Sequence, residues 1–315
     1  MSILVTGAAG FVGSALCAHL VTKGQGVVGA VRSAPKIKLP SVDYRVVAGL
    51  GADTDWCEVL NGVNEVVHCA ARVHVMNETV IDPLEAFREV NVNGTIRLAE
   101  QAANNGVRRF IYLSSIKVNG ESTTNHFFKP EDKPAPEDPY SISKWEAEQA
   151  LQRIAAGTEL EIVIIRPPLV YGPGVGANFR RLMQIVKLGI PLPFGAIHNR
   201  RSLVALDNLI DLIVTCLNHP EAVSHTFLVS DGDDLSTTAL LQRVGNALGR
   251  PARLIPIHTS FLWAVARLLG KVDFVQRICG SLQVDDCKTR SLLEWSPKIS
   301  VDDALQKTAR YFLDD

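Results

Sequence analysis

The sequence predicts an α/β protein with a Rossmann-type doubly wound parallel sheet and a smaller, mostly helical second part. Residues 1–167 alternate short apolar runs with longer helical patterns. Such runs suit strands that are buried on both faces of a parallel sheet. A glycine-rich turn follows the first run, as it does in dinucleotide-binding folds. After about residue 167, clusters of Pro and Gly interrupt this alternation, and mainly helical patterns follow.

Six apolar runs are expected to form the strands of the first part. They cover residues 3–7, 26–31, 44–49, 64–70, 108–115 and 160–167. The helical patterns that separate the longer gaps lie at residues 11–23, 83–105 and 140–154. Right-handed crossovers between parallel strands would place these helices on both faces of the sheet.

Residues 168–315 are expected to be mainly a substrate-binding part, and residues 1–167 a dinucleotide-binding domain. A segment at about 202–230 is expected to return to the sheet. Helical patterns occur near residues 207–218, 237–248, 285–294 and 301–312, with a short strand at 225–230. The apolar helix expected at 259–270 carries a single Arg, so we expect it to pack on the body of the protein rather than to lie at a membrane interface.

The bulk composition excludes several classes of protein. Of the 315 residues, 47% are hydrophobic and 21% are charged, as in ordinary globular domains. The net charge of −1 gives no indication of a nucleic-acid or anionic-membrane partner. Neither a spanning apolar run nor a signal peptide is expected. Six cysteines without C-x-x-C spacing indicate a reduced, cytoplasmic protein without a metal site.

The stretch TGAAGFVG predicts a dinucleotide-binding loop. Gly7, Gly10 and Gly13 directly follow the first predicted strand, and Phe11 and Val12 open the next helix. Glycines let the backbone turn tightly and approach a pyrophosphate, which the amino end of the helix stabilises. The alternative is a glycine-rich turn that serves packing only.

The end of the second predicted strand favours NADP(H) over NAD(H). An NAD site usually offers a carboxylate there for the ribose 2′-hydroxyl. This strand instead ends with Arg32 and Ser33, and residues 27–36 contain no Asp or Glu. An arginine suits a 2′-phosphate through charge-assisted hydrogen bonds. NAD(H) is the alternative if Arg32 is simply a solvated side chain.

A tyrosine and a lysine one helical turn apart are candidate catalytic residues. Tyr140 and Lys144 share one face of the helix that begins with YSISK. We expect the ammonium to stabilise the phenolate and to lower the pKa of Tyr140 from its ordinary value of about 10. The fifth predicted strand ends at Ser114 and Ser115, at the edge of the sheet where such folds bind ligands. A hydroxyl there can hydrogen-bond a substrate carbonyl or alcohol.

The chain resembles the extended short-chain dehydrogenase/reductase family, especially its nucleotide-sugar branch of 4-epimerases, dehydratases and 4-keto reductases. The resemblance covers nearly the whole chain and rests on seven motifs in family order. They are TGAAGFVG (6–13), VVHCAA (66–71), NVNGT (91–95), SSIKVNG (114–120), YSISK (140–144), RPPLVYGPG (166–174) and RRSLVALDN (200–208).

The resemblance implies roles for individual residues. Ser115, Tyr140 and Lys144 look like the catalytic triad, and Lys144 would also hold the nicotinamide ribose. The other residues implied to line the cofactor are Leu50, Ala70, Ala71, Asn91, Pro167 and Val170. Those implied to bind the substrate are Ser114, Asn178, Phe194, Arg201 and Arg277. Within that set, Arg201 would bind the diphosphate and Phe194 would line the nucleobase, whereas the alternative for Arg201 is a loop cation without a ligand.

Two positions depart from the family pattern. Gly49 stands where many members carry an Asp that faces the adenine, which puts adenine recognition by a side chain in doubt. Asn119 stands where epimerases commonly have a tyrosine. The second departure weakens the epimerase interpretation without excluding it.

Together, Arg32 and the resemblance predict an NADPH-dependent reductase of a UDP-4-keto-6-deoxy-hexosamine, in sugar-nucleotide synthesis for surface polysaccharides such as the lipopolysaccharide O-antigen. Tyr140 would protonate the alkoxide formed at C4, and Ser115 would polarise the carbonyl. The alternative is a UDP-hexose or UDP-N-acetylhexosamine 4-epimerase that retains NAD. Further alternatives are a reductase of a non-nucleotide ketone or hydroxysteroid and a non-catalytic NADP(H)-sensing protein. By resemblance, a homodimer that pairs helices 83–105 and 140–154 is expected.

Overall fold

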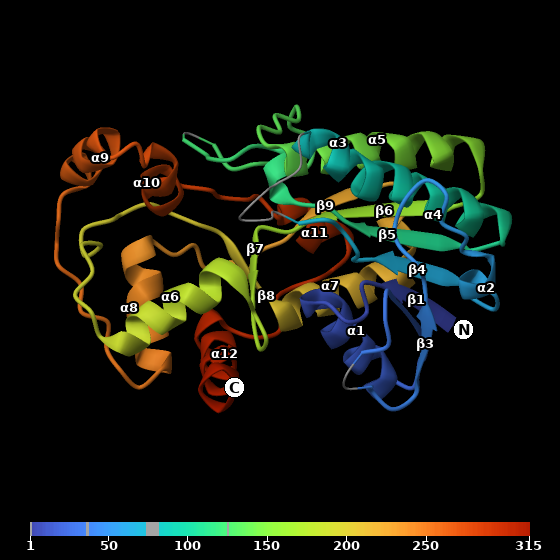
Figure 1. Cartoon of the computed structure of the whole chain (residues 1–315), viewed down its shortest axis with the longest axis horizontal. Coiled ribbons are helices and arrows are strands. Elements are labelled where there is room, and N and C mark those ends of the chain that lie inside the picture. The colour runs from blue at the N-terminus through green and yellow to red at the C-terminus, as the bar shows by residue number, and fades with distance from the viewer. Residues whose placement is uncertain (1, 36–37, 74–81, 125) are drawn as a thin grey trace.

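The computed structural model describes residues 2–35, 38–73, 82–124 and 126–315. Its centre is a seven-stranded parallel sheet with the strand order β3-β2-β1-β4-β5-β6-β9 (Figure 1). The strands are β1 (Ser2–Thr6), β2 (Gly26–Val31), β3 (Val42–Val46), β4 (Glu65–His68), β5 (Arg109–Leu113), β6 (Glu161–Arg166) and β9 (Thr226–Leu228). All six strands expected in residues 1–167 form, and the predicted Rossmann-type fold class is confirmed.

Both faces of the central strands are buried, which explains their continuous apolar character. Along β1, Ile3 and Val5 belong to one hydrophobic core, whereas Leu4 belongs to a second core on the opposite face. This division follows from the alternation of side chains along a strand. Because every pairing in the sheet is parallel, the carboxyl ends of the strands meet at one edge.

Helices cover both faces of the sheet (Figure 1). On one face, α1 (Phe11–Thr22) and α7 (Leu206–Asn218) bury their apolar residues in the first core. On the other face, α4 (Gly94–Asn104) and α5 (Pro139–Gly157) contribute to the second core. The short helices α2 (Cys57–Leu60) and α3 (Pro83–Arg88) contact α4 and α5 respectively.

A π-helical turn interrupts the single helix predicted at residues 83–105. This turn, Glu89–Asn93, joins α3 to α4. The loop after β3 approaches closely here, since a Cβ on Gly94 would lie 2.7 Å from Leu50 Cγ and 3.0 Å from Gly51 N. Glycine at this position therefore allows the loop to pack on the helix. Such turns are frequent at functional sites, and this one contains Asn91.

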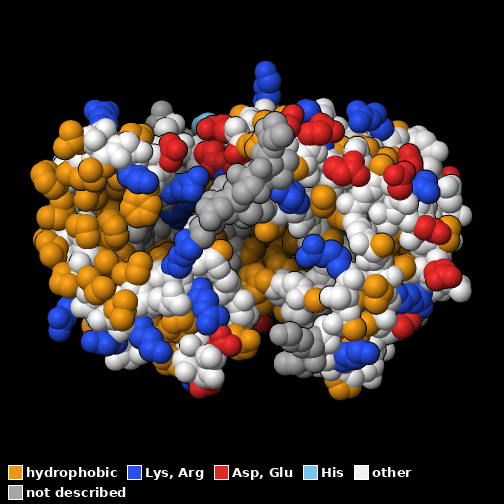
Figure 2. All heavy atoms as spheres, in the orientation of Figure 1, with side chains coloured by type: hydrophobic (Ala, Val, Ile, Leu, Met, Phe, Trp, Pro, Cys, Tyr) orange, Lys and Arg blue, Asp and Glu red, His pale blue; other side chains and the backbone are white. Residues whose placement is uncertain are grey.

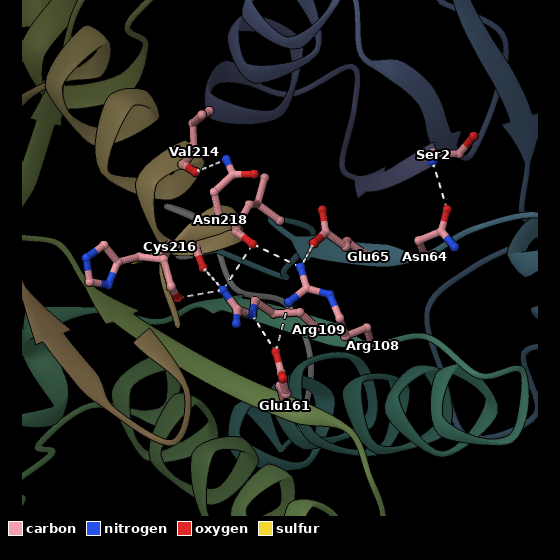
Figure 3. Close-up of polar contacts among 11 residues, drawn as sticks. Ser2, Asn64, Glu65, Arg108, Arg109, Glu161, Val214, Cys216 and Asn218 are labelled. Atoms are coloured by element: carbon pink, nitrogen blue, oxygen red, sulfur yellow. Dashed lines mark hydrogen bonds and ion pairs between the residues drawn. The ribbon is translucent and has the colours of Figure 1, made fainter. Parts of the chain in front are cut away.

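The buried guanidinium of Arg109 fixes the end of α7 to the sheet (Figure 3). Its Nη1 donates hydrogen bonds to the carbonyls of Cys216 (2.7 Å), Leu217 (3.0 Å) and His219 (2.9 Å), and its Nε donates to Glu161 (2.7 Å). The last carbonyls of a helix have no partner within the helix, so this arginine satisfies them from β5. The next strand along the chain, β9, then pairs with β6.

The remaining elements form a smaller, mainly helical part. The strands β7 (Leu169–Tyr171) and β8 (Leu203–Ala205) pair in parallel, and a third hydrophobic core joins three of the helices, α6, α8 and α12. The helices of this part are α6 (Ala177–Leu188), α8 (Thr237–Ala247), α9 (Thr259–Leu268), α10 (Val272–Cys279) and α12 (Val301–Asp314). The short helix α11 (Cys287–Leu292) instead contacts β9 of the large sheet. Short 3-10 turns lie at Ile116–Val118 and Pro220–Ala222. The sequence patterns did not indicate α6, which Pro and Gly clusters flank, or α10, which is short and lies between Gly270 and Gly280.

The expectation that the apolar helix at 259–270 packs on the body of the protein is wrong for most of its side chains. In α9, Ala266 is the one buried residue. The helix contacts α10, where only Val275 is buried. Most of the larger apolar side chains of the two helices are therefore exposed.

Candidate active site

The glycine-rich loop joins β1 to α1 in a conformation that requires glycine. Gly7 has a φ of 66°, in the left-handed region that favours glycine. A Cβ on Gly7 would lie 3.0 Å from Ala70 N, and a Cβ on Gly13 would overlap with the carbonyl oxygen of Gly7. Phe11 and Val12 follow and are partly buried. The loop thus has glycine, without a side chain, where its backbone passes the end of β4.

The amino end of α1 fits an anionic group such as the pyrophosphate of a dinucleotide. Its N-cap, Gly10, makes no side-chain hydrogen bond, and its first turn contains no acidic residue. The first N–H groups of a helix carry a partial positive charge and need partners from outside the helix. A phosphate group satisfies both requirements.

The other predicted cofactor residues lie after strands at the same edge of the sheet, except Val170, which lies within β7. Arg32 and Ser33 follow β2 and are exposed. The remaining ones are partly buried (Leu50, Ala70, Ala71 and Val170) or buried (Pro167). Their contact with a cofactor remains a prediction.

The buried side chain of Asn91 holds the segment after β4 in place. Its amide nitrogen donates to Arg72 O and to Ser143 Oγ, both at 3.0 Å, and its oxygen accepts from Arg72 N at 2.8 Å. The π-helical turn therefore connects the chain after Ala71 with α5. This contact gives Asn91 a positioning role that its motif alone did not indicate.

A capping box and an ion pair bring the segments of Ser115 and Tyr140 together. Asp138 caps α5 by accepting a hydrogen bond from Ser141 N at 2.7 Å, and Ser141 Oγ accepts from Asp138 N at 3.1 Å. Asp138 also accepts a hydrogen bond from Lys117 Nζ at 2.7 Å. Since Lys117 lies two residues after Ser115, this ion pair ties the end of β5 to the first turn of α5.

Ser115 retains a hydroxyl hydrogen for a ligand. Its Oγ accepts a 3.3 Å hydrogen bond from Lys117 N, which caps the short turn after β5. The neighbouring Ser114 is buried, and its hydroxyl donates to Glu148 Oε1 at 2.5 Å. Ser114 thus donates its hydroxyl hydrogen within the protein, and the hydroxyl of Ser115 is better placed to donate to a ligand.

Lys144 reaches from α5 to the carboxyl end of β5. Its buried ammonium donates to Leu113 O at 2.8 Å and lies 4.5 Å from the centre of the Tyr112 ring. The same ammonium lies 6.0 Å from the centre of the Tyr140 ring. The pair therefore shares one face of α5, as the spacing predicts.

The expectation that Lys144 lowers the pKa of Tyr140 is wrong for the protein alone. Burial, with a smaller contribution from the Asp138 carboxylate, raises the pKa of Tyr140 to about 12. Burial also lowers the pKa of Lys144 to about 8. Desolvation dominates the pKa of both groups, and the ammonium is directed to a backbone carbonyl rather than to the phenol.

A buried charged network beneath the two serines escaped sequence analysis. Glu148 and Arg166 form an ion pair with 2.5 Å between Oε2 and Nη2, and both side chains are almost fully buried. Arg166 Nη1 also donates to Asn119 Oδ1 at 2.9 Å, and Asn119 Nδ2 donates to Lys129 O at 2.8 Å. Asn119, which departs from the family pattern, therefore has a structural task at this position.

Two sequence signals could have found this network. Tyr140, Lys144 and Glu148 recur every four residues, so the carboxylate lies on the same helical face as the candidate catalytic pair. Arg166 ends a strand in which the four preceding residues are apolar. A buried arginine requires a partner, although its identity depends on the fold.

A directed chain of hydrogen bonds runs through the buried His68 at the end of β4. Thr95 Oγ1 donates to Asn91 O at 2.7 Å, so it must accept from His68 Nε2, 3.0 Å away. His68 Nδ1 then accepts from Thr6 Oγ1 at 2.7 Å, and Thr6 Oγ1 accepts from Ala70 N at 3.1 Å. The neutral imidazole thus links β1, the segment after β4 and the π-helical turn.

His68 should make the stability of the protein depend on pH between 5 and 7. Burial, together with the charge of Lys144, lowers the pKa of His68 to about 3. The unfolded chain then binds a proton below its ordinary pKa of about 6.5 while the folded protein does not, so stability falls as pH falls. Between pH 6.5 and pH 5 the expected loss is about 2 kcal/mol.

Urea unfolding of the wild type and of His68→Phe at pH 7 and pH 5 measures this contribution. The variant should be less stable at pH 7, because Thr6 and Thr95 lose their partner, but its stability should change less with pH. The exposed His198 provides the control His198→Asn, which should keep the wild-type slope. An unchanged slope in His68→Phe would contradict the assignment of a buried neutral His68.

The candidate substrate residues are distributed over the smaller part. Arg201 Nη1 donates to the carbonyls of Arg277 (3.1 Å) and Gly280 (3.0 Å). Burial lowers the pKa of Arg201, and the nearby Glu121 opposes this shift. Arg201 therefore lies between the end of α10 and the loop after β5, next to the segment of Ser115.

Three further candidates show less contact with that region. The side chain of Arg277 is exposed, although its carbonyl meets Arg201. Asn178 is exposed at the start of α6. Phe194 is partly buried against the third hydrophobic core, and its carbonyl accepts a hydrogen bond from Thr238. Their substrate contacts stay predictions.

The glycine loop, the amino end of α1 and the Tyr140–Lys144 pair all lie at one edge of a parallel sheet. Such a protein is of the dinucleotide-binding α/β class, and its tyrosine and lysine are of the types that serve in acid–base chemistry. The profile of the NAD dependent epimerase/dehydratase family matches residues 3–230, and the chain belongs to this family.

The chain is similar to several known proteins over nearly its whole length. It is 47% identical to a UDP-glucose 4-epimerase of Vibrio cholerae, over 99% of this chain and 95% of that protein. It is 30% identical to a UDP-glucose 4-epimerase of Mycolicibacterium smegmatis, over 99% of this chain and 98% of that protein. The structure of UDP-glucuronic acid 4-epimerase from Bacillus cereus, in complex with NAD, has a TM-score of 0.79 at 23% identity and covers 100% of this chain and 99% of its own. This last likeness concerns the fold alone.

Proposed function

We propose that the protein is a UDP-sugar 4-epimerase that acts on a UDP-hexose or UDP-N-acetylhexosamine and retains NAD. The observation that carries the proposal is the 47% identity, over 99% of the chain, to the Vibrio cholerae UDP-glucose 4-epimerase. The positions of Ser115, Tyr140 and Lys144 around the end of β5 support it. This proposal takes precedence over the 4-keto reductase, which rested on Arg32 and on a general resemblance.

The residues at the end of β5 would move one proton at O4 of the sugar. When bound, a nicotinamide dinucleotide supplies the acceptor and donor of the C4 hydride and, when oxidised, a positive charge that favours the phenolate. Tyr140 accepts the proton of the 4-hydroxyl as C4 becomes a ketone, and it returns that proton when the alcohol re-forms. Ser115 donates a hydrogen bond to O4 in both directions. Inversion results when the ketone presents its opposite face before the proton returns.

Lys144 and Arg201 would assist without exchanging protons with the sugar. The pKa of Lys144, about 8, keeps the ammonium mostly charged at neutral pH. This charge does not lower the pKa of Tyr140 in the protein alone, but it would add to that of the oxidised cofactor in favouring the phenolate. Arg201, directed between α10 and the loop of Glu121, would bind the diphosphate of the nucleotide.

The NADPH-dependent 4-keto reductase is the second candidate, and two observations favour it. Arg32 is exposed directly after β2, where it could meet a 2′-phosphate. Asn119, at a position where epimerases commonly have a tyrosine, is buried and bonded to Arg166 and Lys129. Both observations concern single positions, whereas the identity to the Vibrio cholerae protein covers the chain.

The cofactor and the product together distinguish the two candidates. We expect the purified protein to release NAD on denaturation and to interconvert UDP-glucose with UDP-galactose, or their N-acetyl derivatives, without net change in NADH absorbance. Chromatography of the nucleotide sugars measures the product. Release of no NAD, with NADPH consumed when a UDP-4-keto-6-deoxy-hexosamine is added, would overturn the epimerase in favour of the reductase. Cofactor binding without either reaction would favour the NADP(H)-sensing alternative.

Assembly and location are further parts of the proposal. A homodimer through α4 and α5 is expected, although neither helix exposes a large hydrophobic side chain. The six cysteines all lie among the described residues and are free, which supports a reducing compartment such as the cytoplasm. Light scattering of the purified protein measures the assembly.

A further inference from the structure

Helices α9 and α10 form a hairpin whose larger apolar side chains face outward. Its hydrophobic surface consists of Phe261, Val265, Leu268, Leu269, Val272 and Phe274, which we call the hairpin patch. Leu268 is 87% exposed, Leu269 64%, Phe261 62% and Phe274 55%. Contiguous apolar surface of this kind is rare on monomeric proteins and marks a site of interaction.

The patch projects from the molecule rather than lining a groove. Leu268 and Leu269 end α9 and are followed by Gly270, so the most exposed leucines lie at the turn of the hairpin. Figure 2 shows hydrophobic side chains gathered at the end of the molecule where Figure 1 places α9 and α10. A projecting apolar tip can enter a fluid surface without needing a complementary pocket.

Positive charge surrounds the hairpin, although the whole chain has a net charge of −1. Residues 251–280 contain four basic side chains and a single acidic one, Asp273. The basic residues are Arg253, Arg267, Lys271 and Arg277, and all four are exposed. Lys and Arg lie around the hydrophobic surface in Figure 2, whereas most visible Asp and Glu lie elsewhere. The overall charge therefore conceals a local basic region.

We propose that the hairpin patch docks on the surface of a bilayer containing anionic phospholipids. Apolar and aromatic side chains with basic neighbours are the features by which short helices bind a membrane interface. None of the helices in the described part of the chain is long and apolar enough to cross a membrane. Residues 259–270 contain a single Arg, but the hairpin is more basic than this segment, because Lys271 caps α10 and Arg277 lies in α10.

A second copy of the chain is a poorer occupant of this surface. A symmetric dimer would bring the same patch of both protomers together. The three basic side chains of one hairpin, Arg267, Lys271 and Arg277, would then face those of the other, with a single Asp on each side to offset them. Like charges in contact are unfavourable, whereas anionic headgroups neutralise them.

The base of the hairpin is fixed to the region of the candidate substrate residues. Arg201 donates to the carbonyls of Arg277 and Gly280. Asn199 Nδ2 donates to the carbonyls of Ile278 (3.1 Å) and Gly280 (2.8 Å). Docking would therefore hold the substrate part of the protein close to the membrane surface. The inference does not depend on which reaction the protein performs.

Co-sedimentation with lipid vesicles tests the proposal on the full chain. The wild type should bind vesicles of phosphatidylcholine mixed with phosphatidylglycerol and should bind pure phosphatidylcholine weakly. The double variant L268E/L269E should reduce binding to the mixed vesicles by about tenfold or more. The matched control is V46E/L313E, which replaces two exposed apolar side chains elsewhere with the same change in charge and should bind like the wild type.

A second measurement needs no variant. Of the four tryptophans, Trp56 and Trp295 are buried, Trp145 is partly buried in α5, and Trp263 is partly exposed in α9. Brominated phosphatidylglycerol in the vesicles should quench the fluorescence of the wild type, and high salt should relieve quenching. Absence of both sedimentation and quenching with the mixed vesicles would overturn the proposal. A loss of self-association in L268E/L269E, measured by light scattering and without vesicle binding by the wild type, would assign the patch to a second copy.

Discussion

Tyr140→Phe should lower the turnover of the enzyme by about 10²- to 10⁴-fold, the range typical of a lost proton-transfer group. The variant removes only the phenolic oxygen that would exchange a proton with O4. The ring still packs edge-on against Phe87, with 6.1 Å between ring centres, so the fold should be retained. Conversion of the nucleotide sugar, followed by chromatography at neutral pH, measures the loss.

Binding of the dinucleotide should be nearly unchanged in Tyr140→Phe, because the glycine loop and the amino end of α1 are untouched. Tyr311→Phe is the matched control, since Tyr311 is an exposed residue of α12. It should retain wild-type turnover. Full activity in Tyr140→Phe would show that the triad assignment is wrong.

Glu148→Ala should destabilise the protein by about 3–5 kcal/mol, the cost of leaving a buried charge without its partner. Arg166 would lose both oxygens of the carboxylate, and Ser114 would lose its acceptor. The substitution also leaves a cavity beside the residue that precedes Ser115. Urea unfolding at pH 7 measures the loss of stability.

Two further variants separate the charge from the packing. Glu131→Ala breaks the exposed ion pair with Lys288 and should change stability by no more than about 0.5 kcal/mol. Combining Glu148→Leu with Arg166→Met removes both buried charges, so it should recover much of the stability lost in Glu148→Ala. A loss below about 1 kcal/mol in Glu148→Ala would contradict a buried charge pair.

The positions of the strands along the chain and of the glycine loop could be predicted from the sequence because both depend on local patterns. Val66 and Val67 lie on opposite faces of β4, and both are buried. Burial on both faces makes the strand continuously apolar, and this signal needs no knowledge of its neighbours. The spacing of Gly7, Gly10 and Gly13 likewise follows from a local requirement, because the backbone must turn tightly between β1 and α1.

The pKa of Tyr140 could not be predicted from spacing. The sequence places Lys144 one turn away from Tyr140, and attraction between them would lower the phenol pKa. The fold buries both groups and turns the ammonium toward Leu113 O, so desolvation dominates. Burial depends on every element packed around a side chain, and no pair of positions encodes it.

The exposure of α9 could not be predicted from the sequence either, although here the sequence predicted burial and the fold leaves side chains exposed. Its apolar sequence predicted burial, yet Leu268 and Leu269 are exposed because the neighbour of α9 is a second short helix. The basic residues that accompany the patch come largely from outside 259–270. Only their arrangement in space makes them one surface.

By itself, the sequence determined the parallel sheet, the glycine loop and the pairing of Tyr140 with Lys144 on one helical face. These features depend on residues that are close in the chain or that repeat with the period of a strand or helix. The tertiary structure decided the Glu148–Arg166 pair, the neutral state of His68 and the exposure of the hairpin patch. Each of these depends on which distant segments exclude water from a side chain, and that exclusion exists only after the chain has folded.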